Sequence, residues 1–220
     1  MQEEVLKMYG DSLVFQAKQF EYKKEKYKSK FLELLNKIYQ NYELIIRDKI
    51  KVPRNENKIR DILVDDYLSK NITNYTFKKE EQNNLGRVDI FVQESFIEEK
   101  PEFIIECKIL DNKNTNGLEG LNAKYIKNGI QRFLTEHYHL ENSFKTNAMI
   151  GFIVSKLDIS KNIHSMNILS GKIFNNIVSI TQNISIEESN LYKSTYRTYG
   201  NKEKEFVVYH QMMDFSKKLN

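Results

Sequence analysis

The sequence predicts an α/β fold in which a mixed central sheet is flanked by helices, with a helical extension at the N-terminus. Two short apolar runs, Glu102–Leu110 and Ala148–Ser155, have the length and composition of buried strands. Other segments carry apolar residues at three- and four-residue steps, which is typical of amphipathic helices. The 220 residues are 40% hydrophobic and include only 2 Pro and 8 Gly, a composition typical of a folded, helix-rich chain.

The N-terminal extension is predicted as one helix from Val5 to about Lys49. We assign residues 1–52 to this extension and 53–220 to the main domain, whose core spans 55–155 and whose C-terminal helix and hairpin span 156–220. The apolar face of the helix is expected to pack on the core, and a contact with a second copy of the chain is the alternative. That face comprises Phe31, Leu34, Leu35, Ile38, Tyr42, Ile45 and Ile46.

Lysines crowd the part of this helix that precedes the apolar face, and aromatic residues are interleaved with them. One interpretation is a basic surface that lies near a phosphate backbone. The other is a solvated helix face whose lysine stems cover apolar surface. The residues concerned are Lys18, Lys23, Lys24, Lys26, Lys28 and Lys30, with Phe20, Tyr22 and Tyr27 among them.

A second helix is predicted after Pro53, which interrupts the first. Asn55 is suited to cap a helix that begins near Glu56. Its apolar face comprises Ile59, Ile62, Leu63 and Tyr67. Three strands are then predicted, at Tyr75–Lys79, Arg87–Val92 and Glu102–Leu110.

A polar loop over 111–120 follows the third strand, and it either lines a site there or simply connects two elements. A helix over Asn122–His139 and the strand Ala148–Ser155 complete an order of helix, three strands, helix and strand. We expect a mixed sheet of four or five strands. The C-terminal part is predicted as a helix over Ile163–Ile180, a hairpin of Leu191–Tyr199 and Glu205–Tyr209, and a short helix over His210–Leu219.

Charged residues on the third and second strands indicate a functional site. Glu106 and Lys108 are two residues apart and point to one side of their strand, whereas Ile105 and Cys107 point to the other. Charges on so apolar a strand are costly unless they are paired or hold a metal. If the two strands pair, Asp89 reaches the neighbourhood of Glu106. Two carboxylates and an amine then converge, which suits metal-dependent hydrolysis of a phosphodiester.

These residues resemble the PD-(D/E)XK nuclease superfamily, which has the restriction-endonuclease-like fold. Asp89 matches the aspartate of its motif and Glu106-Cys107-Lys108 matches the (D/E)XK part, although no proline precedes Asp89. The motif is short and degenerate, and the resemblance covers roughly residues 55–155. It implies an αβββαβ core and an Mg²⁺- or Mn²⁺-dependent enzyme that cuts DNA and leaves a 5′-phosphate and a 3′-hydroxyl.

The resemblance also implies roles for individual residues. Asp89 and Glu106 would ligate the metal, and the backbone carbonyl of Cys107 would add a ligand. Lys108 would position the attacking water. Glu56 and Gln131, from the flanking helices, would assist at the site, Glu56 as a further residue facing the metal.

Alternatives remain at each of these positions. A Glu-x-Lys pair on a strand is often a simple ion pair on a solvated face. Glu56 equally suits the first turn of a helix, where it complements the helix dipole. Asp61, Asp65 and Asp66 are weaker site candidates on the same helix.

The net charge of +4 permits contact with nucleic acid without indicating it. A single cysteine excludes an internal disulfide and suits a reducing compartment. Since no apolar run approaches the length of a membrane span and the first residues lack a signal-peptide pattern, we expect a cytoplasmic protein. DNA is the expected partner, with a homodimer or a partner protein left open. The alternative function is a non-catalytic nuclease-fold protein that serves a larger complex as a DNA-binding or regulatory subunit.

Overall fold

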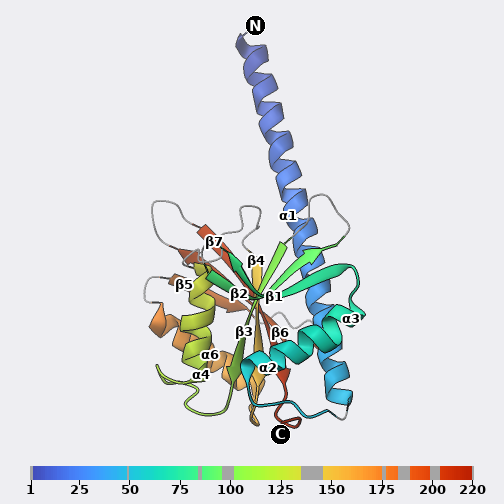
Figure 1. The fold of residues 1–220 in the computed structure, drawn as a ribbon. Coiled ribbons are helices and arrows are strands. Elements are labelled where there is room, and N and C mark those ends of the chain that lie inside the picture. The colour runs from blue at the N-terminus through green and yellow to red at the C-terminus, as the bar shows by residue number, and fades with distance from the viewer. Residues whose placement is uncertain are drawn as a thin grey trace.

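A computed structural model of the chain describes residues 2–48, 50–83, 86–95, 102–134, 146–174, 177–182, 189–198 and 204–219. They form a mixed α/β structure with helices on both sides of one sheet (Figure 1). This confirms the α/β class and the mixed sheet. Among the described residues, no helix combines the length and the apolar character needed to cross a membrane.

The sheet has seven strands in the order β1-β2-β3-β4-β7-β6-β5. The pairs β3–β4 and β4–β7 are parallel, and the other four pairs are antiparallel. The strands are β1 Tyr75–Asn83, β2 Gly86–Glu94, β3 Glu102–Leu110, β4 Thr146–Ile153, β5 Ile177–Gln182, β6 Leu191–Thr198 and β7 Lys204–Asp214. The expected four or five strands were too few, because the C-terminal hairpin joins the sheet through β7 and adds β5 beyond it.

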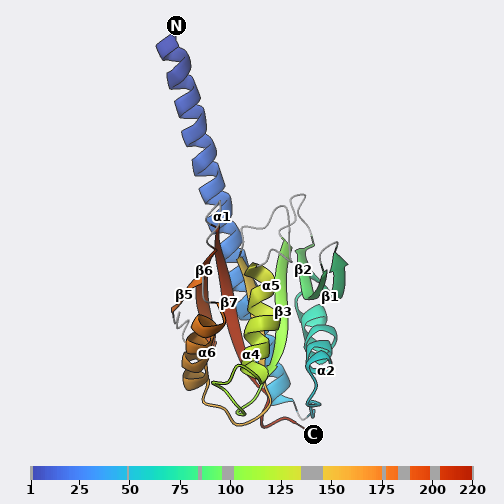
Figure 2. The same ribbon diagram turned by 90° about the vertical axis from the view of Figure 1, so that its left-hand side faces the viewer.

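Two helical layers cover the sheet. In Figure 2, α4 (Leu121–Tyr125), α5 (Gln131–Leu134) and α6 (Ile159–Ile173) lie in front of the sheet, and α1 (Gln2–Arg47) lies behind it. A π-helical turn, η2 (Ile126–Ile130), joins α4 to α5. The other helical stretch runs through α2 (Glu56–Asp61), the π-helical turn η1 (Ile62–Leu68) and α3 (Ser69–Asn71).

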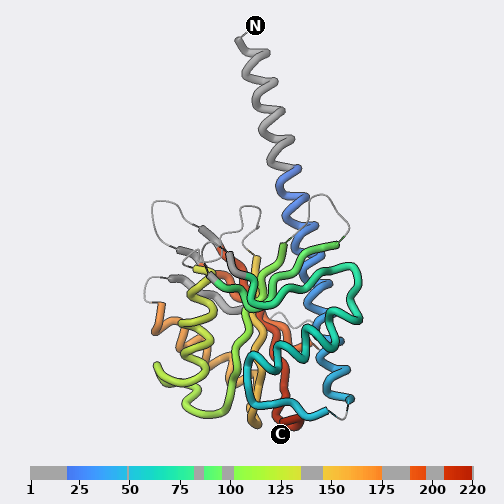
Figure 3. The backbone as a smooth tube through the Cα atoms, in the orientation of Figure 1, coloured from blue at the N-terminus to red at the C-terminus, as the bar shows by residue number. Residues whose placement is uncertain are grey.

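The apolar face of α1 packs on the sheet, as predicted. Phe31, Leu34, Leu35, Ile38 and Ile45 are all fully buried, in one cluster with β3 and β4. The N-terminal extension therefore shares its core with the rest of the chain. The end of the chain also returns to this region, where Leu219 forms a parallel bridge with Val52 just after α1 (Figure 3).

The lysines that precede this face differ in their surroundings. Lys23, Lys24 and Lys26 are exposed. Lys28 lies 3.5 Å from Glu25, and Lys30 pairs with Glu94 at the end of β2 at 2.5 Å. Two lysines of the basic segment thus form ion pairs within the chain.

Strand β4 is buried along its whole length, as predicted for a central strand. The helix predicted over Asn122–His139 begins at Leu121 and is described as far as Leu134; the rest of that prediction lies outside the described residues. Close packing holds this helix on the sheet. Gly129 is buried in η2, where an added Cβ would lie 2.2 Å from Cε of Met149 and 3.7 Å from Cγ of Lys108.

Two C-terminal predictions were wrong. The helix predicted over Ile163–Ile180 ends at Ile173, and Ile177 already belongs to β5. Residues 177–182 read IVSITQ, in which β-branched side chains favour a strand. The helix predicted over His210–Leu219 is instead the continuation of β7 to Asp214, followed by a turn. Because β7 is buried on both faces there, its sequence lacks the alternation that marks a half-exposed strand.

Candidate active site

The candidate site lies where β2 and β3 diverge. Their antiparallel pairing runs from Gln93–Glu102 to Ile90–Ile105 and stops there. Asp89 and Glu106 are the next residues on the two strands, so both lie at the fork. Beyond the fork, the backbone of β3 has no strand partner on this edge and needs other hydrogen-bond partners.

Two carboxylates accept hydrogen bonds from the backbone N–H groups on that edge of β3. The Cys107 N–H donates to Oδ2 of Asp89 over 2.9 Å, and the Ile109 N–H donates to Oε2 of Glu56 over 2.7 Å. Asp89 comes from β2 and Glu56 from the first turn of α2. The fork therefore explains why these two acidic side chains, 33 residues apart in the sequence, accept from N–H groups only two residues apart on the same edge of β3.

Lys108 lies at the centre of the group. Its ammonium donates to the Cys107 carbonyl over 2.6 Å and to Oε1 of Glu106 over 2.7 Å, and lies 3.4 Å from Oδ2 of Asp89. Oε1 of Glu56 is 3.5 Å away. Three carboxylates and one carbonyl oxygen thus surround a single nitrogen atom, which is the convergence that the strand pattern predicted for Asp89, Glu106 and Lys108.

Burial makes this cluster electrostatically strong. Glu106 is fully buried, and the Lys108 side chain is 12% exposed. Desolvation by burial acts to lower the pKa of Lys108, but the charges of Glu106, Asp89 and Glu56 outweigh it, so the pKa lies above its ordinary value. Lys108 therefore carries its proton at neutral pH, and it acts as a cation and a hydrogen-bond donor.

Cys107 contributes its backbone only. Its side chain points away from the fork and is fully buried in the cluster beneath α1, and burial raises the pKa of its thiol well above the usual range. A thiol that stays protonated and inaccessible is a poor nucleophile. The carbonyl oxygen, in contrast, faces the fork and bonds Lys108.

Asn55 caps α2 as predicted, since its side chain accepts a hydrogen bond from the Lys58 N–H over 3.0 Å. The cap fixes the first turn of the helix, and with it Glu56. One turn further along, Arg60 faces the same direction. Glu56 thus has a role beyond complementing the helix dipole.

Arg60 is a site residue that the sequence reasoning missed. Its side chain is 4% exposed, and its guanidinium lies 3.5 Å from Oδ1 of Asp89 and 3.1 Å from both Asp61 and Glu80. Its Nη1 atom is buried without a hydrogen bond, although it faces Asp89. Its spacing of four residues from Glu56 places it on the same helix face but does not indicate that it is buried.

Glu80 stands opposite Asp89 in the register of β1 and β2, where the pairing is interrupted. Its φ of 52° is in the left-handed region, which a glutamate rarely adopts. Residues with such a strained backbone conformation cluster at functional sites, where the surrounding contacts hold the conformation in place. Here the contact is the ion pair of Glu80 with Arg60.

The helix after β3 also supplies Arg132, for which the sequence left open a contact with phosphates or a solvated helix face. Nη1 of Arg132 donates to Oε1 of Glu106 over 2.6 Å. Gln131, the predicted site residue, is its neighbour in α5 and is exposed, and its role in the site stays a prediction. The weaker candidates are used in ion pairs on the outer side of the helix: Asp61 and Asp65 with Lys79, and Asp66 with Lys70.

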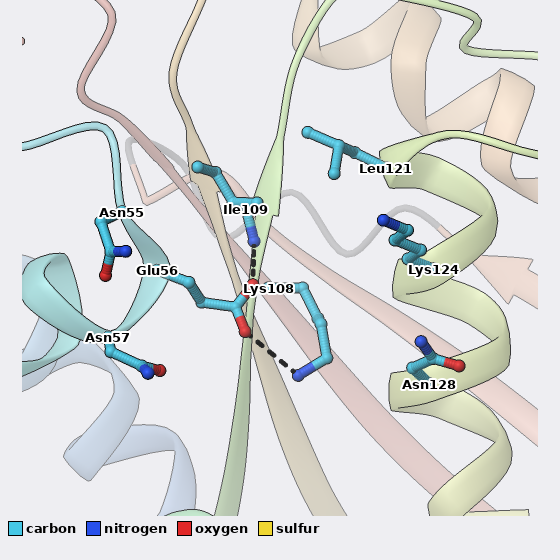
Figure 4. A pocket seen from close by; sticks show the side chains of 8 residues that line it. All are labelled: Asn55, Glu56, Asn57, Lys108, Ile109, Leu121, Lys124 and Asn128. Atoms are coloured by element: carbon cyan, nitrogen blue, oxygen red, sulfur yellow. Dashed lines mark hydrogen bonds and ion pairs between the residues drawn. The ribbon is translucent and has the colours of Figure 1, made fainter.

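An open pocket of about 320 Å³ adjoins the cluster. Figure 4 shows Asn55, Glu56 and Asn57 on one side of it, Leu121, Lys124 and Asn128 on the other, and Lys108 with Ile109 between them. The predicted loop over 111–120 leads into α4 beside this pocket but does not line it.

The donor set fits a magnesium or manganese ion chemically. The Lys108 ammonium stands in for a cation, because the oxygen atoms around it are those of Asp89, Glu106 and the Cys107 carbonyl, which are the predicted ligands. Within the described part of the chain, no three His, Cys, Asp or Glu side chains are placed to hold a metal by themselves. Mg²⁺ usually takes one or two carboxylates and completes its shell with water.

Comparison of the chain with protein-family models, with curated proteins and with solved structures finds no match. The functional argument therefore rests on the side chains at the fork and their geometry.

Proposed function

We propose that the chain is an Mg²⁺- or Mn²⁺-dependent nuclease of the PD-(D/E)XK type that hydrolyses DNA phosphodiester bonds. The observation that carries this proposal is the convergence of Glu56, Asp89, Glu106 and the Cys107 carbonyl on the Lys108 ammonium. The order of helix, β1, β2, β3, helix and β4 supports it, since it is the αβββαβ order of the restriction-endonuclease-like core. A place in restriction, anti-phage defence or mobile-element biology follows by analogy with that superfamily alone.

Asp89, Glu106 and the Cys107 carbonyl would hold the ion. When bound, the ion supplies polarisation of the phosphate and a lower pKa for a bound water. Once the ion takes the place of its ammonium among these oxygen atoms, the protonated Lys108 would orient the attacking water by donating a hydrogen bond and would offset charge that develops on the phosphate oxygens. Arg132 fixes the orientation of Glu106 through Oε1. The water oxygen would attack phosphorus as the bond to the 3′-oxygen breaks. The water gives up its proton to solvent, the 3′-oxygen takes one and leaves as a hydroxyl, and the phosphate stays on the 5′-oxygen.

The second candidate is a non-catalytic protein of the same fold that acts as a DNA-binding or regulatory subunit. One observation favours it: Lys108 already forms ion pairs with Glu56, Asp89 and Glu106. In this alternative the cluster is structural, and no divalent cation is required.

Cleavage of supercoiled plasmid, linear duplex and single strands in Mg²⁺ or Mn²⁺ tests the proposal. We expect the wild type to cut at least one substrate and Lys108→Ala to lose at least about a hundredfold in rate, because an electrostatic stabiliser of this kind contributes that much. Lys172→Ala is the matched control, since Lys172 is exposed on α6. Equal cutting by wild type and Lys108→Ala would refute the assignment, and no cutting by the wild type with either metal would favour the non-catalytic alternative.

A further inference from the structure

The pocket beside Lys108 is also lined by Lys124, whose ammonium forms no ion pair with the carboxylates of the cluster among the described residues. Within the pocket, Glu56 and Lys108 offset each other: one oxygen of Glu56 accepts from the Ile109 N–H and the other lies 3.5 Å from the Lys108 ammonium. Lys124 lines the opposite wall and is exposed. Its ammonium has no carboxylate partner among the described residues. Lys124 therefore gives this wall of the pocket an ammonium that is available to an anion.

Amide groups accompany this lysine. Asn128 lies one turn beyond Lys124 on the same wall, and Asn57 lies on the facing wall (Figure 4). In the part of the chain that the structure describes, neither amide has a hydrogen-bond partner. An ammonium beside amide N–H donors is the combination with which proteins contact the phosphates of nucleic acids.

The helix continues from these residues to the catalytic cluster. Lys124, Asn128 and Arg132 are spaced by four residues, and Arg132 reaches Glu106. Because the π-helical turn η2 lies between them, Lys124 and Arg132 are about two turns apart on the helix. Asp89 and Glu106, which would hold the ion, do not line the pocket, so a nucleic-acid strand that places one phosphate beside them presents a neighbouring phosphate to Lys124.

We infer that this pocket is a subsite for the backbone phosphate that flanks the hydrolysed one, with Lys124 neutralising its charge and Asn128 donating to its oxygen atoms. The inference rests on the proposed function, since it deepens the account of the substrate. It assigns to α4 and η2 the task of setting the register of the strand in the site. Lys124 is a substrate-binding residue and takes no part in the chemistry at phosphorus.

The test is binding of a labelled DNA duplex in EDTA, measured by fluorescence anisotropy from about 50 to about 200 mM salt. Lys124→Ala should weaken binding and reduce the slope of log K against log salt by about one, as expected when one phosphate contact is lost. Lys124→Arg should retain the slope. The matched control is Lys127→Ala, because Lys127 is exposed one turn away but bonds the Leu118 carbonyl over 2.9 Å and does not line the pocket.

A second arm locates the phosphate. Duplexes that carry one neutral methylphosphonate at successive positions should include one at which wild type and Lys124→Ala bind equally, because each change removes the same contact. Additive losses at every position, or a salt slope for Lys124→Ala equal to that of Lys127→Ala, would overturn the subsite. Failure of the nuclease proposal gives a different result. In that case the salt dependence of DNA binding still changes in Lys124→Ala, but the wild type cuts no DNA with Mg²⁺ or Mn²⁺.

Discussion

Asp89 is held from two directions, and this makes Arg60 the residue on which the site most depends outside the motif. One oxygen of Asp89 accepts from the Cys107 N–H, while the other faces the Arg60 guanidinium at 3.5 Å. Arg60 itself is almost fully buried among Asp61, Glu80 and Asp89. Removing it leaves the buried Asp89 carboxylate with only the Lys108 ammonium, which Asp89 shares with Glu106 and Glu56.

Arg60→Met is therefore expected to lower the free energy of unfolding by about 3–5 kcal/mol, the usual loss when one partner of a buried pair is removed. Urea denaturation measures it. Lys70→Met is the control, because Lys70 and its partner Asp66 are 64% and 56% exposed, and exposed pairs contribute about 0–1 kcal/mol. Similar losses in the two variants would show that Arg60 does not hold the site together.

His210 provides a prediction of acid sensitivity. It is buried between the hydroxyls of Tyr125 and Ser194, each 2.9 Å from a ring nitrogen, and burial lowers its pKa to about 3. In the unfolded chain a histidine titrates near 6.5, so the unfolded state binds the extra proton between these values. The stability that the neutral His210 contributes is thus fully present above about pH 6.5 and is lost as the pH falls toward 3.

The loss attributable to His210 is roughly 3 kcal/mol between pH 7 and pH 4. Urea denaturation across this range should show a shallower pH dependence for His210→Gln than for wild type. His164→Gln, at an exposed position on α6, should follow the wild type. Parallel pH profiles for His210→Gln and wild type would mean that the buried imidazole does not titrate as described.

The motif residues were predictable from the sequence, and Arg60 and Arg132 were not. Glu106 and Lys108 stand out because charges interrupt an apolar strand, and alternation places them on one side. Arg60 lies on an ordinary amphipathic helix, and its burial depends on where Glu80 and Asp89 lie in three dimensions. No local pattern carries that information.

At the scale of elements, the approach of α4, η2 and α5 to the sheet depends on Gly129. Met149, which the added Cβ would meet, is itself fully buried, so it has little room to move. Gly129→Ala should therefore push the helix away from β3 and β4, and with it Arg132 and the wall of the pocket. π-helical turns such as η2 often occur at functional sites.

We expect Gly129→Ala to cost about 1–3 kcal/mol, as overpacking usually does, and to slow cleavage. Thermal denaturation and the plasmid assay measure the two effects. Gly171→Ala is the control: it lies in α6 with open space around it, and replacing a helical glycine there should stabilise by up to about 1 kcal/mol. A stable and fully active Gly129→Ala would show that the close approach is not required.

Elements were predictable where burial differs between faces or where the chain has clear boundary signals. The bounds of β3 agree at both ends, and Asn55 marks the start of α2. The prediction failed at β5 and β7. At β7 the buried residues include His210 and Gln211, so neither an apolar run nor a period of two marks the end of the strand, and only tertiary contacts reveal it.

At the scale of the whole molecule, the site exists because the sheet forks. Strand β3 pairs with β4 along its C-terminal half but loses β2 after Ile105, and carboxylates from β2 and α2 replace the missing strand. The sequence predicts that Asp89 and Glu106 come close if their strands pair. It does not predict that pairing ends beside them, which is what frees the Cys107 carbonyl.

The most direct test of this account is the melting temperature of the wild type and of Asp89→Asn as Mn²⁺ is increased. If the oxygen atoms at the fork bind a divalent cation in the folded state, Mn²⁺ raises the melting temperature of the wild type progressively, and this rise is absent in Asp89→Asn. Asp158→Asn, at the exposed cap of α6, should respond as the wild type does. A wild type whose melting temperature is independent of Mn²⁺, or an equal rise in Asp89→Asn, would contradict the metal site at the fork.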